Sequence, residues 1–286
     1  MITQAYVMRG IGDALNSRDF LLNYCEQKHK NQDSITVYTS IHKNIFKDTR
    51  FKIENATKCD ITKLTYYANF GYFDLPKWYS DKRFDKCIAV NANINYTFNK
   101  IKKLNWNCNI SDIDLPEKFV TVNYGHDNNS NPMMKCIKMW SLDYWNKLVY
   151  LLFELGIDCV QIGGGWSCKD IRGVKVNLVN KLFLEQSAMI MKKALFHIDV
   201  EGGLVILAQH LGVKSVVLFG ATDNRHFGRK GNLNLRNSNC NACSGNIDKG
   251  SLSKPLYVWD NNCNSRCMLD LKPEYVLEKI KENNWL

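Results

Sequence analysis

The second half of the chain repeats one pattern, an apolar strand that ends at glycine and leads into a helix, and this pattern constrains the fold most strongly. Leucines at helical spacing from Leu148 to Leu155 predict a helix that Ser141 caps and Gly156 ends. The predicted helices cover 141–156, 184–193 and 204–211, and the predicted strands are KFVTVNYG (118–125), IDCVQIGGG (157–165), LFHIDV (195–200) and KSVVLFG (214–220). This alternation predicts an α/β domain with a parallel sheet and right-handed crossovers.

Glycine occurs at the carboxyl end of each of these strands. The four carboxyl ends are 123–125, 163–165, 201–203 and 220–222. Ligands of open parallel sheets bind at the carboxyl ends of the strands, and glycine turns there let a ligand approach the backbone closely. The sequence therefore predicts a binding site along this edge of the sheet.

The first part of the chain predicts a second, shorter α/β unit. Residues 2–9 have strand composition, the turn G-I-G-D follows, and a helix through LLNYCEQ leads to a strand at 34–40. The pattern from 41 to 118 is weak. We expect a shortened domain at 1–115, a second domain at 116–272 and a C-terminal helix at 273–286. That helix starts at Pro273 and is expected to pack back across the junction between the domains.

Composition and charge exclude several classes of protein. Hydrophobic residues make up 45% and charged residues 23% of the 286 residues, which is ordinary globular usage. No run of apolar residues is long enough to span a membrane, and the N-terminal sequence lacks the features of a secretion signal, so we expect a cytoplasmic protein. The net charge of +10 is scattered, which favours weak peripheral attraction to the inner face of an anionic inner membrane over a nucleic-acid groove.

Four of the eleven cysteines are clustered, as Cys240-N-A-Cys243 and Cys263-N-S-R-Cys267. Two close thiolate pairs are typical of a tetrahedral site for zinc or iron. Because thiolates take all four positions, such a site is structural and leaves no position open for catalysis. Two disulfides or four free thiols are the alternative interpretations.

Several short motifs occur in a characteristic order. They are R-G-I-G-D (9–13), K-C-I-K-M-W (135–140), G-G-G (163–165), E-G-G (201–203) and L-F-G-A-T (218–222), followed by the cysteine cluster. Together they resemble glycosyltransferase family 9, the heptosyltransferases of lipopolysaccharide core, capsule and some autotransporter modification. The resemblance covers about residues 118–270 and, locally, 1–40. It implies the GT-B architecture, in which two Rossmann-like domains face each other across a cleft.

The resemblance implies that Asp13 is the general base, which accepts the proton of the acceptor hydroxyl. From the residues alone, a carboxylate that caps the following helix is the simpler interpretation. Lys138, two residues before Trp140, is implied to contact the donor phosphates beside a helix N-terminus. Lys135 is the alternative, and a plain surface lysine is the simplest interpretation of either; Trp140 is expected to pack in the core.

Glu201, Gly202 and Gly203 match the donor-binding turn of the family, whose backbone N–H groups hold the phosphates of the departing nucleotide. The family commonly has Asp, then Ser or Thr, then Gly, with a histidine three residues later, where this chain has Ile206. The backbone contacts survive these differences, whereas the side-chain contacts to the sugar change. His210, one turn later, is expected to lie on the helix face without binding a ligand.

Three further residues are assigned to the donor pocket by the resemblance alone. Gly164 and Thr222 lie in glycine turns that would line the nucleotide, and Glu185 lies where the family keeps residues near the base or ribose. The alternative interpretation of Gly164 and Thr222 is that their turns only connect strands to helices. The alternative for Glu185 is a solvent-facing glutamate on a helix.

The resemblance as a whole implies an inverting glycosyltransferase without a catalytic metal. Its donor would be ADP- or GDP-heptose, and its acceptor a hydroxyl of a glycan, a lipid-linked glycan or a protein. A catalytically inactive protein that binds nucleotide-sugars is one alternative, suggested by Ile206 and the short N-terminal half. A zinc-knuckle protein that binds nucleic acid is another, and the long glycine-punctuated α/β half argues against it.

Overall fold

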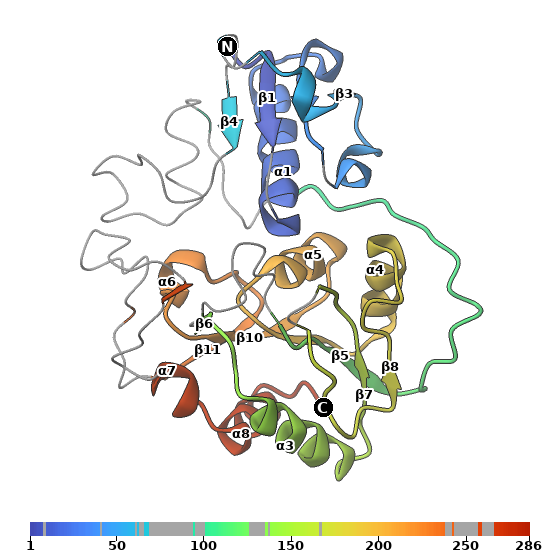
Figure 1. Cartoon of the computed structure of the whole chain (residues 1–286), viewed down its shortest axis with the longest axis vertical. Helices are drawn as coiled ribbons and strands as arrows, with labels where there is room; N and C mark the ends of the chain where they lie inside the picture. The colour runs from blue at the N-terminus through green and yellow to red at the C-terminus, as the bar shows by residue number, and fades with distance from the viewer. Residues whose placement is uncertain are drawn as a thin grey trace.

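A computed structural model shows two α/β domains, one above the other along the long axis of the molecule (Figure 1). An extended linker at 101–118 joins them along one side of the view. The structure describes residues 1–7, 10–40, 42–60, 62, 66–68, 94, 101–125, 135–136, 138–165, 168–237, 242, 257–258 and 266–286.

The N-terminal domain is a parallel sheet with one long helix packed against it. Its strands lie in the order β3-β2-β1-β4, and each pairing is parallel. The elements are β1 (Gln4–Val7), α1 (Ile11–Gln27), β2 (Thr36–Tyr38), β3 (Lys52–Glu54) and β4 (Tyr66–Ala68), with 3-10 turns η1 (Gln32–Ser34), η2 (Lys43–Phe46) and η3 (Ala56–Lys58). The strand, helix and strand predicted within residues 2–40 are all present, with shorter strands.

The C-terminal domain is a six-stranded sheet in the order β11-β10-β9-β5-β7-β8, in which every pairing is parallel. Its strands are β5 (Phe119–Val122), β7 (Asp158–Gln161), β8 (Val176–Asn177), β9 (His197–Val200), β10 (Ser215–Phe219) and β11 (Leu233–Arg236). Its helices are α3 (Leu142–Phe153), α4 (Leu184–Lys193), α5 (Gly203–Leu211), α6 (Asn224–Phe227), α7 (Arg266–Leu269) and α8 (Pro273–Glu282), and β6 (Lys135–Cys136) pairs antiparallel with β12 (Tyr257–Val258). The predicted parallel sheet is confirmed. Ser141 lies at the N-cap of α3, but its side chain makes no capping hydrogen bond.

The C-terminal helix differs from its expected position. α8 packs against α3 and β11 within the C-terminal domain and does not cross the domain junction. Its buried residues Val276 and Ile280 join a core cluster with Trp145 and Leu148 of α3. Figure 1 shows α3 and α8 together on the side of the sheet turned away from the N-terminal domain. The apolar face of the helix is covered there, because α3 offers the matching apolar face.

The junction between the two domains is a packed core. One apolar cluster contains Phe20 and Leu21 of α1, Leu207 and Ala208 of α5, and Trp106 of the linker. All five side chains are at most 2% exposed. The two domains therefore bury apolar surface against each other, and this burial favours one relative orientation.

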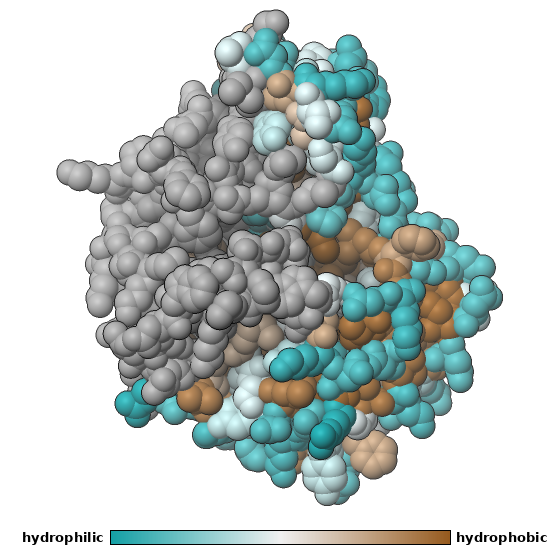
Figure 2. Space-filling model, viewed as in Figure 1, coloured by the Kyte–Doolittle hydropathy of each residue, from teal (hydrophilic) through white to brown (hydrophobic). Residues whose placement is uncertain are grey.

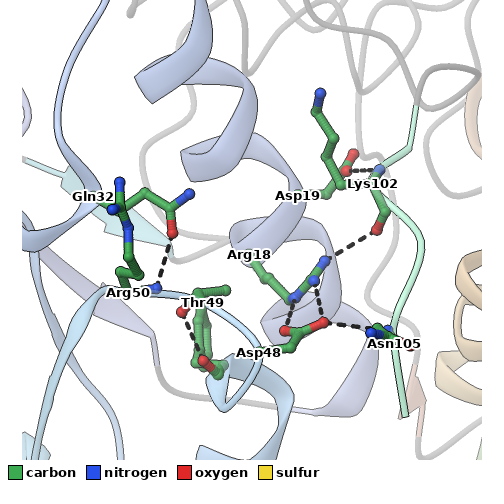
Figure 3. A network of polar contacts seen from close by, with 9 residues as sticks. Arg18, Asp19, Gln32, Asp48, Thr49, Arg50, Lys102 and Asn105 are labelled. Carbon is green, nitrogen blue, oxygen red and sulfur yellow. Dashed lines mark hydrogen bonds and ion pairs between the residues drawn. The ribbon is translucent and has the colours of Figure 1, made fainter.

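The linker is also held by polar contacts, which Figure 3 shows. Arg18 of α1 donates from Nε and Nη2 to the two carboxylate oxygens of Asp48, at 3.0 and 2.6 Å. Its Nη1 donates to the carbonyl oxygen of Lys102 at 3.0 Å, and the backbone N–H of Lys102 donates to Asp19 Oδ1 at 2.5 Å. The backbone N–H of Asn105 donates to Asp48 Oδ2 at 3.3 Å. The first residues of the linker are therefore bound to α1 and to the segment that follows η2.

The described surface is mixed rather than uniformly polar (Figure 2). Single apolar side chains such as Phe183 and Phe153 are 78% and 61% exposed. Across the described ranges, no helix has the length and apolar content needed to cross a membrane.

Candidate functional site

The turn between β9 and α5 lies directly against the N-terminal domain. A Cβ atom on Gly203 would lie 3.1 Å from the backbone nitrogen of Gly12, and a Cβ on Gly12 would lie 2.8 Å from Ile206 Cδ1. Glycine at both positions therefore lets the first turns of α1 and α5 touch across the junction. Ile206, at the position where the sequence motif of glycosyltransferase family 9 commonly has histidine, packs here between the domains.

Two helix N-termini meet at this contact. The N-cap residues are Gly10 for α1 and Gly202 for α5, and neither helix start has a side-chain cap. The first N–H groups of a helix lack intrahelical partners and carry a partial positive charge, so they favour an anion. Asp13 lies in the first turn of α1 and is partly exposed. Because Gly10 occupies the N-cap, Asp13 is not the N-cap residue.

Three predicted donor residues come together at the strand ends. Lys138, just before α3, forms an ion pair with Glu201, which follows β9. The hydroxyl of Thr222, which follows β10, donates to Glu201 Oε2 at 3.2 Å. The side chains of Lys138 and Glu201 are only 7% and 16% exposed. The site therefore contains an almost buried ammonium group whose charge a neighbouring carboxylate balances.

Glu185 lies outside this group of three. It is in the first turn of α4, and its Oε1 is 3.0 Å from Nζ of Lys47, the residue that follows η2 in the other domain. Lys47 Nζ also lies 5.7 Å from the ring centre of Trp106. Glu185 therefore makes an ion pair across the domain junction, a contact that its sequence context does not reveal.

The remaining predicted residues near the site are placed as follows. Gly164 is exposed, beside Asn180, whose Oδ1 accepts the backbone N–H of Gly165 at 2.8 Å. Trp140 is 1% exposed and donates from Nε1 to the carbonyl oxygen of Leu271 at 2.8 Å, so it packs as expected. The side chain of Lys135 lies outside the described residues.

A buried polar network beneath the turn was not predicted. Asn123 Nδ2 lies 3.1 Å from both carboxylate oxygens of Asp199, and His197 Nε2 lies 3.4 Å from Oδ2. His197 Nδ1 is 3.0 Å from Thr121 Oγ1. Burial raises the pKa of Asp199, while the hydrogen bonds from His197, Asn123 and the Val200 N–H oppose that rise. The network joins the ends of β5 and β9 two residues before Glu201. The sequence feature that could have predicted this network is the His and Asp at alternate positions of the otherwise apolar strand LFHIDV.

His210 was expected on the face of its helix without a ligand, and the structure places it in the core. It is 0% exposed, and its ring Nδ1 lies 2.9 Å from the carbonyl oxygen of Ile206. Desolvation, helped by the nearby positive charges of Arg229 and Arg18, lowers its pKa to about 3. Arg229, itself 4% exposed, donates across the junction to Asn16 Oδ1 at 2.8 Å.

The buried imidazole of His210 gives the stability of the fold a pH dependence. In the unfolded chain the imidazole has a pKa of about 6.5, so it is protonated below that pH. In the native state it stays neutral until the pH falls to about 3. Stability is therefore lost as pH falls below 6.5, by about 2 kcal/mol between pH 7 and pH 5. Urea unfolding at both pH values should show that His210→Gln loses about 2 kcal/mol less than wild type over this interval. Equal losses would contradict the assignment.

The cysteine cluster lies largely beyond the described ranges. Cys240, Cys243 and Cys263 lie outside the described residues, whereas Cys267 is in α7 and 3% exposed. Among the residues that the structure describes, no three His, Cys, Asp or Glu side chains are grouped for a metal.

Two parallel Rossmann-like sheets with this junction define a GT-B-like fold. No protein-family profile and no curated protein matches the sequence. Among solved structures, the chain is similar to the iron-containing dodecameric glycosyltransferase TibC from enterotoxigenic E. coli, with 13% identity, a TM-score of 0.74, and coverage of 98% of this chain and 77% of that one. A second structure describes TibC as a heptosyltransferase in complex with ADP-D-β-D-heptose.

Two other solved structures are similar over nearly the whole of both chains. The glycosyl transferase family 9 protein from Veillonella parvula is 12% identical with a TM-score of 0.64, and the alignment covers 98% of this chain and 96% of that chain. The E. coli ADP-heptose lipopolysaccharide heptosyltransferase II is also 12% identical with a TM-score of 0.64, and the alignment covers 99% and 98%. At these identities the likeness establishes the fold.

Proposed function

We propose that the protein is a glycosyltransferase of family 9. It transfers a sugar, preferably heptose, from ADP- or GDP-heptose to a hydroxyl of a glycan, a lipid-linked glycan or a protein in bacterial surface glycoconjugate synthesis. The sequence motifs and the GT-B-like fold shared with heptosyltransferases support this proposal.

The observation that carries the proposal is the meeting of two uncapped helix N-termini beside the almost buried Lys138. N–H groups and an ammonium at one place favour a diphosphate and stabilise the negative charge that develops on it as it leaves. Asp13 follows Gly12, which contacts Gly203 across the domain junction, so the backbone of Asp13 lies near the same turn. The proposed donor site and the proposed base thus belong to the two domains that meet at this junction.

In the proposed reaction, the acceptor oxygen attacks the anomeric carbon and forms the new glycosidic bond. The bond between that carbon and the β-phosphate oxygen breaks, and its electron pair leaves with the nucleoside diphosphate. The proton of the acceptor hydroxyl passes to the carboxylate of Asp13. Attack from the face opposite the leaving group inverts the anomeric centre. Lys138 and the backbone N–H groups at Gly202 and Gly203 hold the diphosphate, with Gly164 and Thr222 along the nucleotide and Glu185 near its base or ribose.

The test is a thermal-shift titration of the purified protein with ADP-, GDP-, UDP- and CDP-sugars. Ligands that bind only the native state raise the unfolding midpoint, by about 2.7 kcal/mol of added stability at 100 times the dissociation constant. We expect stabilisation by one nucleotide class, which identifies the donor. The absence of a shift with all four classes would refute a nucleotide-sugar site.

We also propose that Cys240, Cys243, Cys263 and Cys267 hold one structural zinc or iron ion. Four thiolates are a donor set suited to either metal, and the neighbour TibC is iron-containing. Cys267 is buried in the core of the C-terminal domain, so a shared metal would tie α7 to Cys240, Cys243 and Cys263.

Elemental analysis should find about one zinc or iron per chain, and Cys240→Ser/Cys243→Ser should abolish it and lower the unfolding midpoint. Cys25→Ser, at a separate buried cysteine, is the control for metal content. Metal-free protein from anaerobic purification would contradict the proposal.

A further inference from the structure

The ammonium group of Lys138 already has an anionic partner in the folded protein. Its side chain is 7% exposed and is ion-paired with Glu201, which is 16% exposed. The Thr222 hydroxyl donates to the same carboxylate at 3.2 Å and helps to fix it beside the lysine. A pair this well buried holds together, because separating either charge leaves the other desolvated without a partner.

Any phosphate that contacts Lys138 must therefore approach Glu201. Two oxygens that accept hydrogen bonds from one nitrogen lie within roughly 5 Å of each other. The carboxylate and the phosphate are both negative, so they repel at this distance. The repulsion grows with the charge on the phosphate group.

The two relevant ligands differ in that charge. In a nucleotide-sugar, the terminal phosphate is esterified to the sugar and carries one negative charge. In the free nucleoside diphosphate, the same phosphate carries about 1.5 to 2 negative charges at pH 7, because its second pKa is about 6. Glu201 consequently opposes the free diphosphate more strongly than the sugar ester.

We propose that Glu201 is a specificity-determining residue that selects sugar-esterified diphosphates over free diphosphates at Lys138. This inference rests on the proposed function, since it requires the donor to be held at that lysine. Its consequence is that the site weakens its hold on the nucleotide once the sugar has been transferred, which favours product release.

The test compares ADP with its β-methyl ester, which has the charge of a sugar ester but no sugar ring. Isothermal titration of the full-length chain, as purified, measures both dissociation constants for wild type, Glu201→Gln and Glu282→Gln. Glu282 lies in the exposed ion pair with Lys279 and is the matched control. In Glu201→Gln, the affinity for ADP relative to the ester should rise about tenfold, as expected for removing one nearby charge. In Glu282→Gln the ratio should stay at the wild-type value.

The outcomes separate this inference from the proposed function. If both ligands bind and Glu201→Gln leaves their ratio unchanged, the role of Glu201 is refuted and the donor site stands. If wild type binds neither ADP nor its ester, nor the same pair made from GDP, UDP or CDP, the donor site itself is refuted. Should Glu201→Gln fail to fold, Glu201→Ala replaces it, because the smaller side chain admits water to Lys138; the same rise in ratio is then required.

Discussion

Replacing Asp13 with asparagine should lower the turnover of sugar transfer by at least about 100-fold, the usual contribution of a general base. Asparagine keeps the size and polarity of the side chain but cannot accept the acceptor proton at neutral pH. Donor affinity should change little, because the proposed phosphate contacts come from Lys138 and the turn at Gly202 and Gly203. The measurement is single-turnover transfer to a supplied acceptor, together with titration of the donor.

A matched control is Asp33→Asn in η1, where the aspartate is exposed on the same domain. It should retain wild-type turnover. If Asp13→Asn loses donor binding together with turnover, Asp13 is part of the binding surface and not the base. If wild type binds the donor but transfers no sugar to any acceptor class, the chain is an inactive nucleotide-sugar-binding protein, and Ile206 in place of the family's histidine becomes the first position to restore.

The alternation of strands and helices in the C-terminal half was predictable because its signals are local. Helical leucine spacing and glycine at Gly156 identified α3 without any tertiary information, and the apolar strand ending at Gly220 identified β10. The packing partner of α8 was not predictable in the same way. Its apolar face indicates that the helix is buried. Whether it packs on α3 or at the domain junction depends on residues more than 100 positions away in the sequence. The hydrogen bond between Trp140, just before α3, and Leu271, just before α8, is one such long-range contact.

In the candidate site, too, the residues were predictable from sequence but their pairing was not. Motif order selected Lys138, Glu201 and Thr222 independently, and the structure brings them together. No local pattern indicated that the lysine and glutamate neutralise each other across 63 positions of sequence. Glu185 was assigned by the family resemblance alone, and its ion pair with Lys47, 138 positions away, depends on how the domains meet. Long-range pairings of this kind need the fold before they can be derived.

Asp48→Ala should destabilise the fold by about 3–5 kcal/mol, because it leaves the charge of Arg18 buried without its carboxylate. Arg18 is 3% exposed and bonds both oxygens of Asp48, so water cannot easily replace the lost partner. Glu54→Ala is the control, because it breaks an exposed ion pair with Lys58. The side chains of Glu54 and Lys58 are 44% and 69% exposed, so the change should cost less than about 1 kcal/mol of stability. Urea unfolding measures both.

The double variant Arg18→Met/Asp48→Leu should recover much of the loss, because it removes the unpaired charge as well as the pair. Asp48→Ala should also speed hydrogen exchange at the Asn105 amide, whose acceptor is Asp48 Oδ2. A loss of stability below about 1 kcal/mol, or unchanged exchange at Asn105, would show that the linker is held without this ion pair, by the packing of Trp106 and the hydrogen bonds of Lys102. The predicted outcome instead makes this buried ion pair one of the links between α1, which carries Asp13, and the chain that leads into the C-terminal domain.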